Sequence, residues 1–413
     1  MRKHFQRSQK DITYRLFQGR GIHWVLLPCC SLQNSPFRHI QKLNRLKNDN
    51  KSAQILAHLS RFLYFCEPIL FLCMDKNIVL QYIKEHPGVS SKQIADALTG
   101  EASLATIKRA ITELINSFYI SVEGKARATK YFVSPLFAPI DLDDYYSKEV
   151  DERQVQTGYN FDLIPKVLSH VNLFTEQEMA TLNTLQNQFA QNFASLTDEQ
   201  KRKEMERLGI DLSWKSSQIE GNTYSLLETE RLLKEKQTAA GKTKEEAIML
   251  LNHKDALDFI VANPDYMKHL TISRIEDIHS LLIKELGVDR NIRTRRVGIT
   301  GTNYRPIDNE FQIREALQQT CDLVNNRTNV FEKALFVLVL LSYIQAFNDG
   351  NKRIARITSN AILIANGYCP IPFRTVDSIN YKKAMLLFYE QNNISAFKQI
   401  FIDQFRFAVE TYF

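Results

Sequence analysis

The fold of this chain is decided by residues 345–356, which read Gln345-Ala346-Phe347-Asn348-Asp349-Gly350-Asn351-Lys352-Arg353-Ile354-Ala355-Arg356. The stretch lies between two apolar runs, residues 335–344 and 357–365, and both have the length and composition of buried helices. Glycine and asparagine favour tight turns, so the segment from Asp349 to Lys352 is predicted to be a short loop that opens a helix.

The residues of this loop suit a phosphate group. Gly350 lets the backbone come close to a ligand, and the free N–H groups of the next helix would point at an anion. Arg353 and Arg356 are three residues apart on one helix face, and each guanidinium can fork onto phosphate oxygens. Asp349 is a hard oxygen ligand of the kind that Mg²⁺ prefers. The sequence therefore predicts a site for a diphosphate or triphosphate with a metal ion, and a purely structural turn between core helices is the alternative.

This stretch resembles the signature of the Fic family, His-x-Phe-x-Asp/Glu-Gly-Asn-Gly/Lys-Arg-x-x-Arg. The resemblance implies a mainly α fold, with a Fic-like helical core and a small β-hairpin flap, over residues 161–413. It also implies ATP as substrate or ligand, with Mg²⁺ bound by Asp349. The implied contacts to the α- and β-phosphates come from Gly350, Asn351, Lys352 and Arg353, and the contact to the γ-phosphate comes from Arg356.

The first position of the signature departs from the family, because Gln345 stands where the resemblance implies a catalytic histidine. In the family that histidine takes the proton from a Ser, Thr or Tyr hydroxyl of a target protein. A general base must change its protonation state near the working pH, which an amide does not do. His253 and His279 are no obvious substitutes, since both fall in amphipathic helices and are expected to be satisfied structural groups.

A second motif, Ser216-Ser217-Gln218-Ile219-Glu220-Gly221-Asn222, resembles the inhibitory pattern of the family, Ser/Thr-x-x-x-Glu-Gly/Asn. By resemblance, Ser216, Glu220 and Gly221 are the inhibitory residues, and Glu220 would pair with Arg356. An ordinary helix end is the alternative, because Gly or Asn is a common helix stop.

Residues 293–306 form a third candidate segment. Short alternation around Gly298 and Gly301 predicts a β-hairpin. It resembles the flap that holds the target side chain in the family, and Thr302, Asn303 and Tyr304 are the residues expected to do so. A purely structural hairpin is compatible with the same pattern. Tyr381 and Asn392 lie where the family often places contacts to the nucleotide.

The N-terminal 73 residues differ from the rest of the 413-residue chain, whose length predicts two or three domains. They carry 12 Lys and Arg against 3 Asp and Glu, whereas residues 74–413 carry 41 against 43. They also hold four of the six cysteines, without a Cys-x-x-Cys pair, which favours a reducing, cytoplasmic setting over a zinc or redox site. We expect a poorly structured basic segment, with Met74 as the true start; a basic arm that binds nucleic acid is the alternative.

Residues 77–135 follow the order of a winged helix-turn-helix, with three helical stretches, two short strands and a basic tip. Such a domain places its recognition helix in the major groove of double-stranded DNA. The expected DNA contacts are Thr106, Lys108 and Arg109 from that helix and Lys125, Arg127 and Lys130 from the wing. A domain used only for protein docking is the alternative.

Residues 136–160 are predicted to be a linker, since Pro139 and an acidic run interrupt any period. The sequence favours a cytoplasmic, bacterial Fic-type nucleotide-binding protein that transfers AMP to a protein target and is autoinhibited by Glu220, with catalysis in question because of Gln345. The alternatives are a catalytically silent nucleotide sensor that regulates transcription, and a toxin-like module that transfers another phosphate group. No membrane partner is expected, because no apolar run reaches the ~20 residues of a membrane span. A homodimer is left open.

Overall fold

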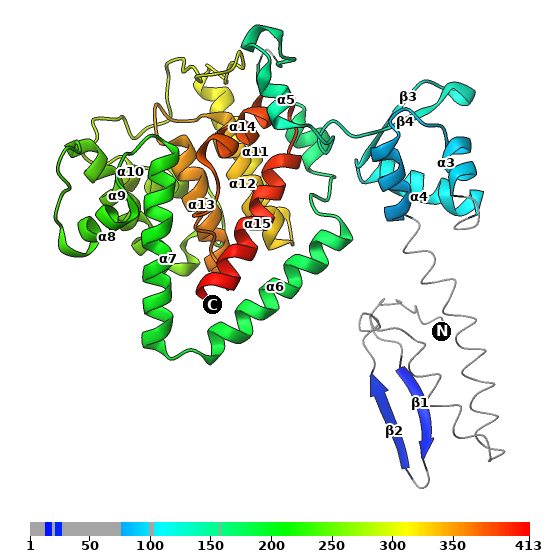
Figure 1. Ribbon diagram of the computed structural model, residues 1–413, viewed down its shortest axis with the longest axis horizontal. Helices are drawn as coiled ribbons and strands as arrows, with labels where there is room; N and C mark the ends of the chain where they lie inside the picture. Colours follow the sequence, from blue (N-terminus) through cyan, green and yellow to red (C-terminus); the bar gives the residue numbers. More distant parts are fainter. Residues whose placement is uncertain (1–12, 19–20, 27–75, 99–102, 157) are drawn as a thin grey trace, which may run out of the picture. The chain divides into compact units, whose positions relative to one another are not determined.

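The computed structural model describes residues 13–18, 21–26, 76–98, 103–156 and 158–413 (Figure 1). The chain divides into two compact units, residues 1–72 and 73–413. In the first unit β1 (Thr13–Gln18) and β2 (Gly21–Leu26) pair as an antiparallel hairpin. The other residues of the basic segment, and the proposed start at Met74, lie outside the described residues.

The second unit begins with three helices and two strands, in the order that the sequence predicts. Ser90 and Ser103 cap the second and third helices by accepting hydrogen bonds from the backbone N–H groups of Gln93 and Thr106. The strands pair antiparallel, with Glu123 opposite Lys130. The elements are a helix over residues 76–85, α3 (Ser91–Ala97), α4 (Leu104–Asn116), β3 (Ile120–Glu123), the 3-10 turn η1 (Ala126–Ala128) and β4 (Lys130–Val133).

The segment 136–160, expected to be a linker, has structure of its own. It contains α5 (Leu142–Ser147) and the 3-10 turn η2 (Val150–Glu152), and α5 packs against α14 (Ser378–Gln391) of the helical core. Asp141 caps α5 by accepting from the N–H groups of Asp143 and Asp144, so the acidic run that seemed to break the chain's period starts a helix.

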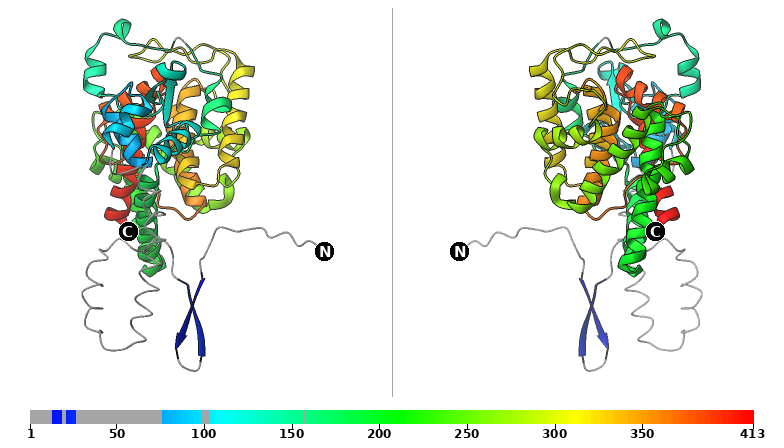
Figure 2. Two further views of the ribbon diagram at one scale, coloured as in Figure 1. Left: turned by 90° about the vertical axis from the view of Figure 1, so that its right-hand side faces the viewer. Right: turned by 90° about the vertical axis from the view of Figure 1, so that its left-hand side faces the viewer.

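The rest of the unit is helical, as expected, and Figures 1 and 2 show its helices gathered around α12 and α13. No described helix is long and apolar enough to cross a membrane. The elements that remain to be named are the π-helical turn η3 (Leu163–Leu168), α6 (Glu176–Ser195), α7 (Asp198–Ile219), α8 (Leu226–Glu235), α9 (Lys244–Ala262), the 3-10 turn η4 (Pro264–Met267), α10 (Ile272–Leu282), α11 (Glu310–Asn326), α12 (Val330–Ile344), α13 (Asn351–Ala365) and α15 (Ser395–Tyr412).

Four consecutive helices start at a capping box, in which a Ser or Thr side chain and a Glu or Gln three residues later satisfy each other's backbone N–H groups. This local code explains why α6 to α9 begin where they do. The pairs are Thr175 with Glu178, Thr197 with Gln200, Ser225 with Glu228 and Thr243 with Glu246.

The central helix is α12, whose residues from Phe331 to Ile344 are nearly all apolar and, apart from the half-buried Lys333, all buried. A helix that is apolar on every side must be covered on every side. It packs against α11, α13 and α14, and α13 also contacts α7, α9 and α10. The loop between α12 and α13 therefore has a rigid frame.

The prediction of a β-hairpin over residues 293–306 is wrong, because this flap segment contains no strand. Two of its carbonyl groups, and the one of Ile307 just beyond it, accept hydrogen bonds from arginine side chains. The buried Arg293 guanidinium donates to the carbonyls of Arg295 and Ile307, and Arg153 donates to the carbonyl of Gly301. An ion pair of 2.8 Å between Arg296 and Asp308 also ties the flap segment to the chain beyond it.

Candidate functional site

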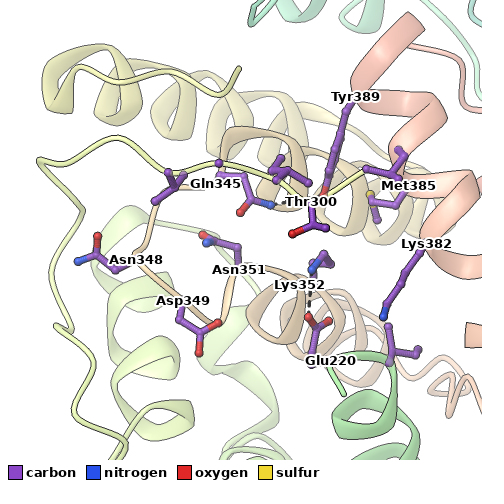
Figure 3. Close-up of a pocket in the computed structure, with 15 residues that line it drawn as sticks. Glu220, Thr300, Gln345, Asn348, Asp349, Asn351, Lys352, Lys382, Met385 and Tyr389 are labelled. Carbon is purple, nitrogen blue, oxygen red and sulfur yellow. Dashed lines mark hydrogen bonds and ion pairs between the residues drawn. The ribbon is translucent and has the colours of Figure 1, made fainter. Parts of the chain in front are cut away.

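A cavity of about 420 Å³ opens where the α12–α13 loop, the end of α7, the flap segment and α14 meet (Figure 3). One wall is polar and comes from the loop and the start of α13, and the other comes from the flap segment and α14. The lining residues are Ile219 and Glu220 from the end of α7, Val297, Gly298, Ile299 and Thr300 from the flap segment, Gln345, Asn348, Asp349, Asn351 and Lys352 around the loop, and Lys382, Met385, Leu386 and Tyr389 from α14.

The loop is closed by one asparagine. Asn351 Nδ2 donates to the carbonyl of Phe347 at 2.7 Å, and the N–H of Phe347 donates back to Asn351 Oδ1 at 2.8 Å. Gly350 takes a left-handed conformation, with φ of 83°, and a Cβ at this position would lie 3.3 Å from His279 Nε2. Glycine is therefore favoured here by the backbone angle, and any side chain would also crowd His279.

Neither histidine considered as a substitute base lines the cavity. His279 stacks on Phe347 with 3.7 Å between ring centres, and its Nε2 lies 2.9 Å from the carbonyl of Asp349, so it is a structural group as expected. His253 is buried, and burial lowers its pKa to about 3, which keeps it neutral. The expectation that His253 is satisfied is wrong, because neither ring nitrogen has a hydrogen-bond partner among the described residues.

Asp349 is a partly exposed carboxylate of the α12–α13 loop that lines the cavity. Its Oδ2 accepts from Arg353 Nη2 at 2.7 Å, and its side chain is 59% exposed, so the second oxygen faces solvent. An ion such as Mg²⁺ that takes most of its ligands from water and phosphates needs only one such carboxylate from the protein. Arg353 itself is buried behind the cavity wall.

Arg356 is also buried, and it faces the end of α7 rather than the cavity. Its Nη2 donates to Glu220 Oε1 at 2.8 Å and to the carbonyl of Ser216 at 2.9 Å. Its Nε donates to Ser216 Oγ, also at 2.8 Å. The structure thus brings Arg356 together with Glu220 and Ser216, which precede it in the sequence by 136 and 140 residues. Gly221 follows with φ of 103° and does not line the cavity.

A second cation reaches the same carboxylate. Lys352 Nζ donates to Glu220 Oε2 at 3.0 Å, as the dashed line in Figure 3 marks. Burial of Glu220 opposes its ionisation, but Arg356 and then Lys352 outweigh burial and lower its pKa from 4.5 to about 2. Each oxygen of Glu220 therefore holds one cation, and we call Glu220, Arg356, Lys352 and Ser216 the Glu220 network.

The side chain of Gln345 is held by its own helix. Its Nε2 donates to the carbonyl of Ser342 at 2.6 Å and lies 3.4 Å from the hydroxyl of Tyr389. The backbone of Gln345 is left-handed, with φ of 54°, and ends α12. Its amide lines the cavity but, unlike an imidazole, has no proton-accepting nitrogen.

Sequence reasoning did not single out Arg293 as a site residue. Its Nε donates to the carbonyl of Gln345 at 2.5 Å, and its backbone N–H donates to Ala346 at 3.0 Å. With its bonds to the flap segment, this one buried side chain ties the end of α12 to the flap. A signal was present in the run Arg293-Thr294-Arg295-Arg296, but nothing in the run says which arginine is buried.

Tyr381 and Asn392, which were expected to contact the nucleotide, do not line the cavity. Tyr381 is fully buried, with its ring 5.4 Å from the Arg356 guanidinium carbon. Asn392 is buried beyond the end of α14 and accepts from Asn160 Nδ2 at 2.9 Å. The lining residues lie on another face of the helix, and among them Lys382 has no hydrogen-bond or ion-pair partner among the described residues.

The expected flap residues lie just beyond the cavity, which is lined up to Thr300. Thr302 Oγ1 accepts from the N–H of Tyr304, Asn303 Nδ2 donates to Asp151 at 2.8 Å, and the buried Tyr304 donates to the carbonyl of Tyr343. These three side chains make structural contacts within the chain.

The candidate DNA-binding residues are placed at α4 and the β3–β4 pair. Lys108, Arg109, Lys125 and Lys130 are exposed, whereas Thr106 is half-buried and its hydroxyl lies 2.8 Å from Ser103 Oγ in the helix cap. The side chain of Arg127 lies outside the described residues.

Comparison with known proteins identifies the central part of the chain. Residues 269–363 match the sequence model of the Fic/DOC family, so the chain contains a Fic/DOC domain that includes the α12–α13 loop. A solved structure described as "Fic-1 (aa134 - 508) from C. elegans" superposes with a TM-score of 0.50 over 57% of this chain and 72% of that chain. At 21% identity this likeness shows a shared fold.

Two curated relatives carry the name "Protein adenylyltransferase fic-1". The one from Caenorhabditis elegans is 28% identical over 160 residues, which are 37% of this chain and 31% of the relative. The one from Caenorhabditis briggsae is 26% identical over 208 residues, or 49% of this chain and 40% of the relative. The chain therefore spans well under half the length of these relatives.

Proposed function

We propose that this chain is a Fic-type protein that binds ATP with Mg²⁺ and is built to transfer AMP to a protein hydroxyl, with the Glu220 network holding it in a resting state. The observation that carries the proposal is that Glu220 occupies both Lys352 and Arg356 at the edge of the cavity. A cation bound to an internal carboxylate is not free to bind a phosphate. Support also comes from the Fic/DOC match and from the names of the two relatives.

In this proposal the polar wall binds the phosphates. The free N–H groups at the start of α13 point at an anion, and Lys352 and Arg356 contact it once Glu220 moves away. A bound Mg²⁺, with Asp349 as its protein ligand, would neutralise charge between the phosphates. Lys352 and Arg356 would then favour the triphosphate over shorter nucleotides.

The transfer step needs a place for one proton. A hydroxyl oxygen of the target bonds to the α-phosphorus, the bond to the bridging oxygen breaks, and pyrophosphate leaves. Gln345 can orient the hydroxyl but cannot take its proton, which must go to water or to the departing pyrophosphate. Loss of a positioned base removes a factor of about 10²–10⁴, so slow transfer is the expected behaviour.

The test is self-modification with ATP labelled at the α-phosphate and Mg²⁺, comparing the parent chain with Gln345→His, Glu220→Gly and the double variant. We expect label in the double variant at a rate about 10²–10⁴ times that of Glu220→Gly alone. Asp349→Ala in the double background is the matched control and should lose label. Absence of label from all variants that bind ATP would refute AMP transfer.

A second function is favoured by one observation, the exposed pair Lys108 and Arg109 on α4. In that function the N-terminal module binds double-stranded DNA and the Fic/DOC domain senses a nucleotide. Arg109→Ala should then weaken binding of duplex DNA at low salt, with Glu113→Ala on the same helix as a control that removes an acidic side chain instead. Equal affinity of parent and Arg109→Ala for duplex DNA would leave a docking role for this module.

A further inference from the structure

The strongest unassigned feature outside the α12–α13 loop is a buried arginine from the segment before the helical core. Arg153 follows η2, and its side chain is 3% exposed although it lies in a region expected to be a linker. Its Nη2 donates to the carbonyl of Gly301 in the flap segment at 2.7 Å. Its Nη1 lies 3.2 Å from Glu390 Oε1 on α14, and that carboxylate is completely buried.

These two partners stand next to the cavity on different elements of its second wall. Gly301 follows Thr300, and Glu390 follows Tyr389, and both Thr300 and Tyr389 line the cavity. Gly301 also lies close to α14, since a Cβ added at Gly301 would lie 3.8 Å from Leu386 Cδ1. One guanidinium thus joins the flap segment to α14 from behind.

The surroundings hold the guanidinium in place. The Tyr145 hydroxyl donates to Glu390 Oε2 at 2.7 Å, and the Tyr146 ring centre lies 4.9 Å from the guanidinium carbon of Arg153. Asn303 also donates to Asp151 at 2.8 Å, which adds a second bond between the flap segment and η2. A buried charged pair adds little net stability compared with apolar residues, but removal of one partner leaves the other charge uncompensated.

We propose that Arg153 is a positioning residue, which sets the distance between the flap segment and α14 and thereby the width of the opening through which a target side chain enters. The inference rests on the proposed function in that it assigns the flap segment to the protein target rather than to the nucleotide. Arg153 touches neither ligand in this scheme, because it does not line the cavity. It acts through Gly301 and Glu390.

The test uses the full chain and measures amide hydrogen exchange of residues 296–304. Arg153→Lys keeps a positive charge, but a lysine ammonium is a point donor that does not reproduce the forked contact to both partners. We expect exchange in the flap segment to become roughly tenfold faster, while exchange in α13 stays unchanged. Glu390→Gln, which keeps the shape and removes the charge, should move the same segment in the same direction.

The matched control is Lys383→Met. Lys383 pairs with Asp143 at 2.5 Å and so ties the same linker to the same helix, without contacting the flap segment. This variant should leave flap exchange at the parent rate. Parent-like flap exchange in both Arg153→Lys and Glu390→Gln would overturn the inference, and so would equal acceleration in Lys383→Met.

A second readout separates the inference from the proposed function. In the Gln345→His, Glu220→Gly background, Arg153→Lys should raise KM for a protein target several-fold and change the KM for ATP by less than about twofold. A chain that never binds ATP would refute the proposed function, yet hydrogen exchange would still decide whether Arg153 positions the flap segment. A rise in KM for ATP alone would contradict the assignment to the target.

Discussion

The two walls of the cavity differ in whether their charged side chains are paired. On the α13 side every charged group named above is engaged: Asp349 with Arg353, and Lys352 and Arg356 with Glu220. On the α14 side the wall is mainly apolar and aromatic, with Met385, Leu386 and Tyr389, and its one charge, on Lys382, has no partner among the described residues. The two cations that we propose to bind a triphosphate, Lys352 and Arg356, are therefore both paired with one carboxylate, that of Glu220.

The largest effect expected from this contrast is on stability. The pKa of Glu220 lies at about 2 against 4.5 for an ordinary glutamate, so its ionisation stabilises the folded state above pH 4.5. That contribution, about 3 kcal/mol, is lost as pH falls from 4.5 towards 2. Urea unfolding of the parent and of Glu220→Gln should differ by up to about 3 kcal/mol at pH 7, and the difference should shrink as pH falls below 4.5. A difference that does not change with pH would mean that the ion pairs contribute nothing.

The second effect is on nucleotide affinity. Removal of Glu220 should raise this affinity, whereas it lowers the stability of the fold. Glu220→Gly frees Lys352 and Arg356, and hydrogen bonds to charged groups contribute about 1.5–3 kcal/mol each. We expect a non-hydrolysable ATP analogue with Mg²⁺ to bind about 10–100 times more tightly, by calorimetry at fixed salt. Glu230→Gln, which removes the same charge from a residue on α8 that does not line the cavity, is the control and should leave affinity unchanged. Equal affinities for parent and Glu220→Gly would show that the network does not oppose binding.

The smallest effect concerns the opposite wall. Lys382→Met should weaken binding of the same analogue only about two- to fivefold, because an exposed charge contributes ~1 kcal/mol or less. The difference should fade at high salt, since exposed charges are screened. Lys383→Met is the neighbouring control, as Lys383 points to Asp143 instead. A loss larger than that caused by removing Lys352 would reverse the roles of the two walls.

The sequence predicts the α13 wall of the site better than the α14 wall. Of the residues predicted on the α13 side, Asp349, Asn351 and Lys352 line the cavity, because a turn followed by a helix start is a local feature, whereas Arg353 and Arg356 lie behind the cavity wall. The pairing of Glu220 with Arg356 came from a family resemblance and is present in the structure. On the other wall, Tyr381 and Asn392 were expected, but the cavity is lined by Lys382 and its neighbours. Which face of α14 meets the cavity depends on how α14 packs against α12 and α5, and its sequence alone does not state this.

The β-hairpin prediction for the flap segment was wrong for a related reason. Alternation around two glycines is typical of a hairpin, but strands form only if their carbonyls are free to pair. Here the carbonyls of Gly301 and Arg295 accept instead from Arg153, which lies far away in the sequence, and from the buried Arg293. The role of Arg153 was hidden for the same reason, since nothing in the sequence around it distinguishes a buried arginine from a solvated one.

The Glu220 network has one more consequence, which concerns how such a protein responds to its own abundance. Glu220 and Arg356 belong to the same chain, and α7 packs directly against α13. The carboxylate is therefore present at a high effective concentration that does not depend on how many copies surround the molecule. Dilution or overproduction leaves the fraction of paired chains unchanged, and only a competitor for the carboxylate or for its two cations shifts it. Under the proposed function, a cell that makes more of this protein would therefore hold proportionately more of it in the resting state.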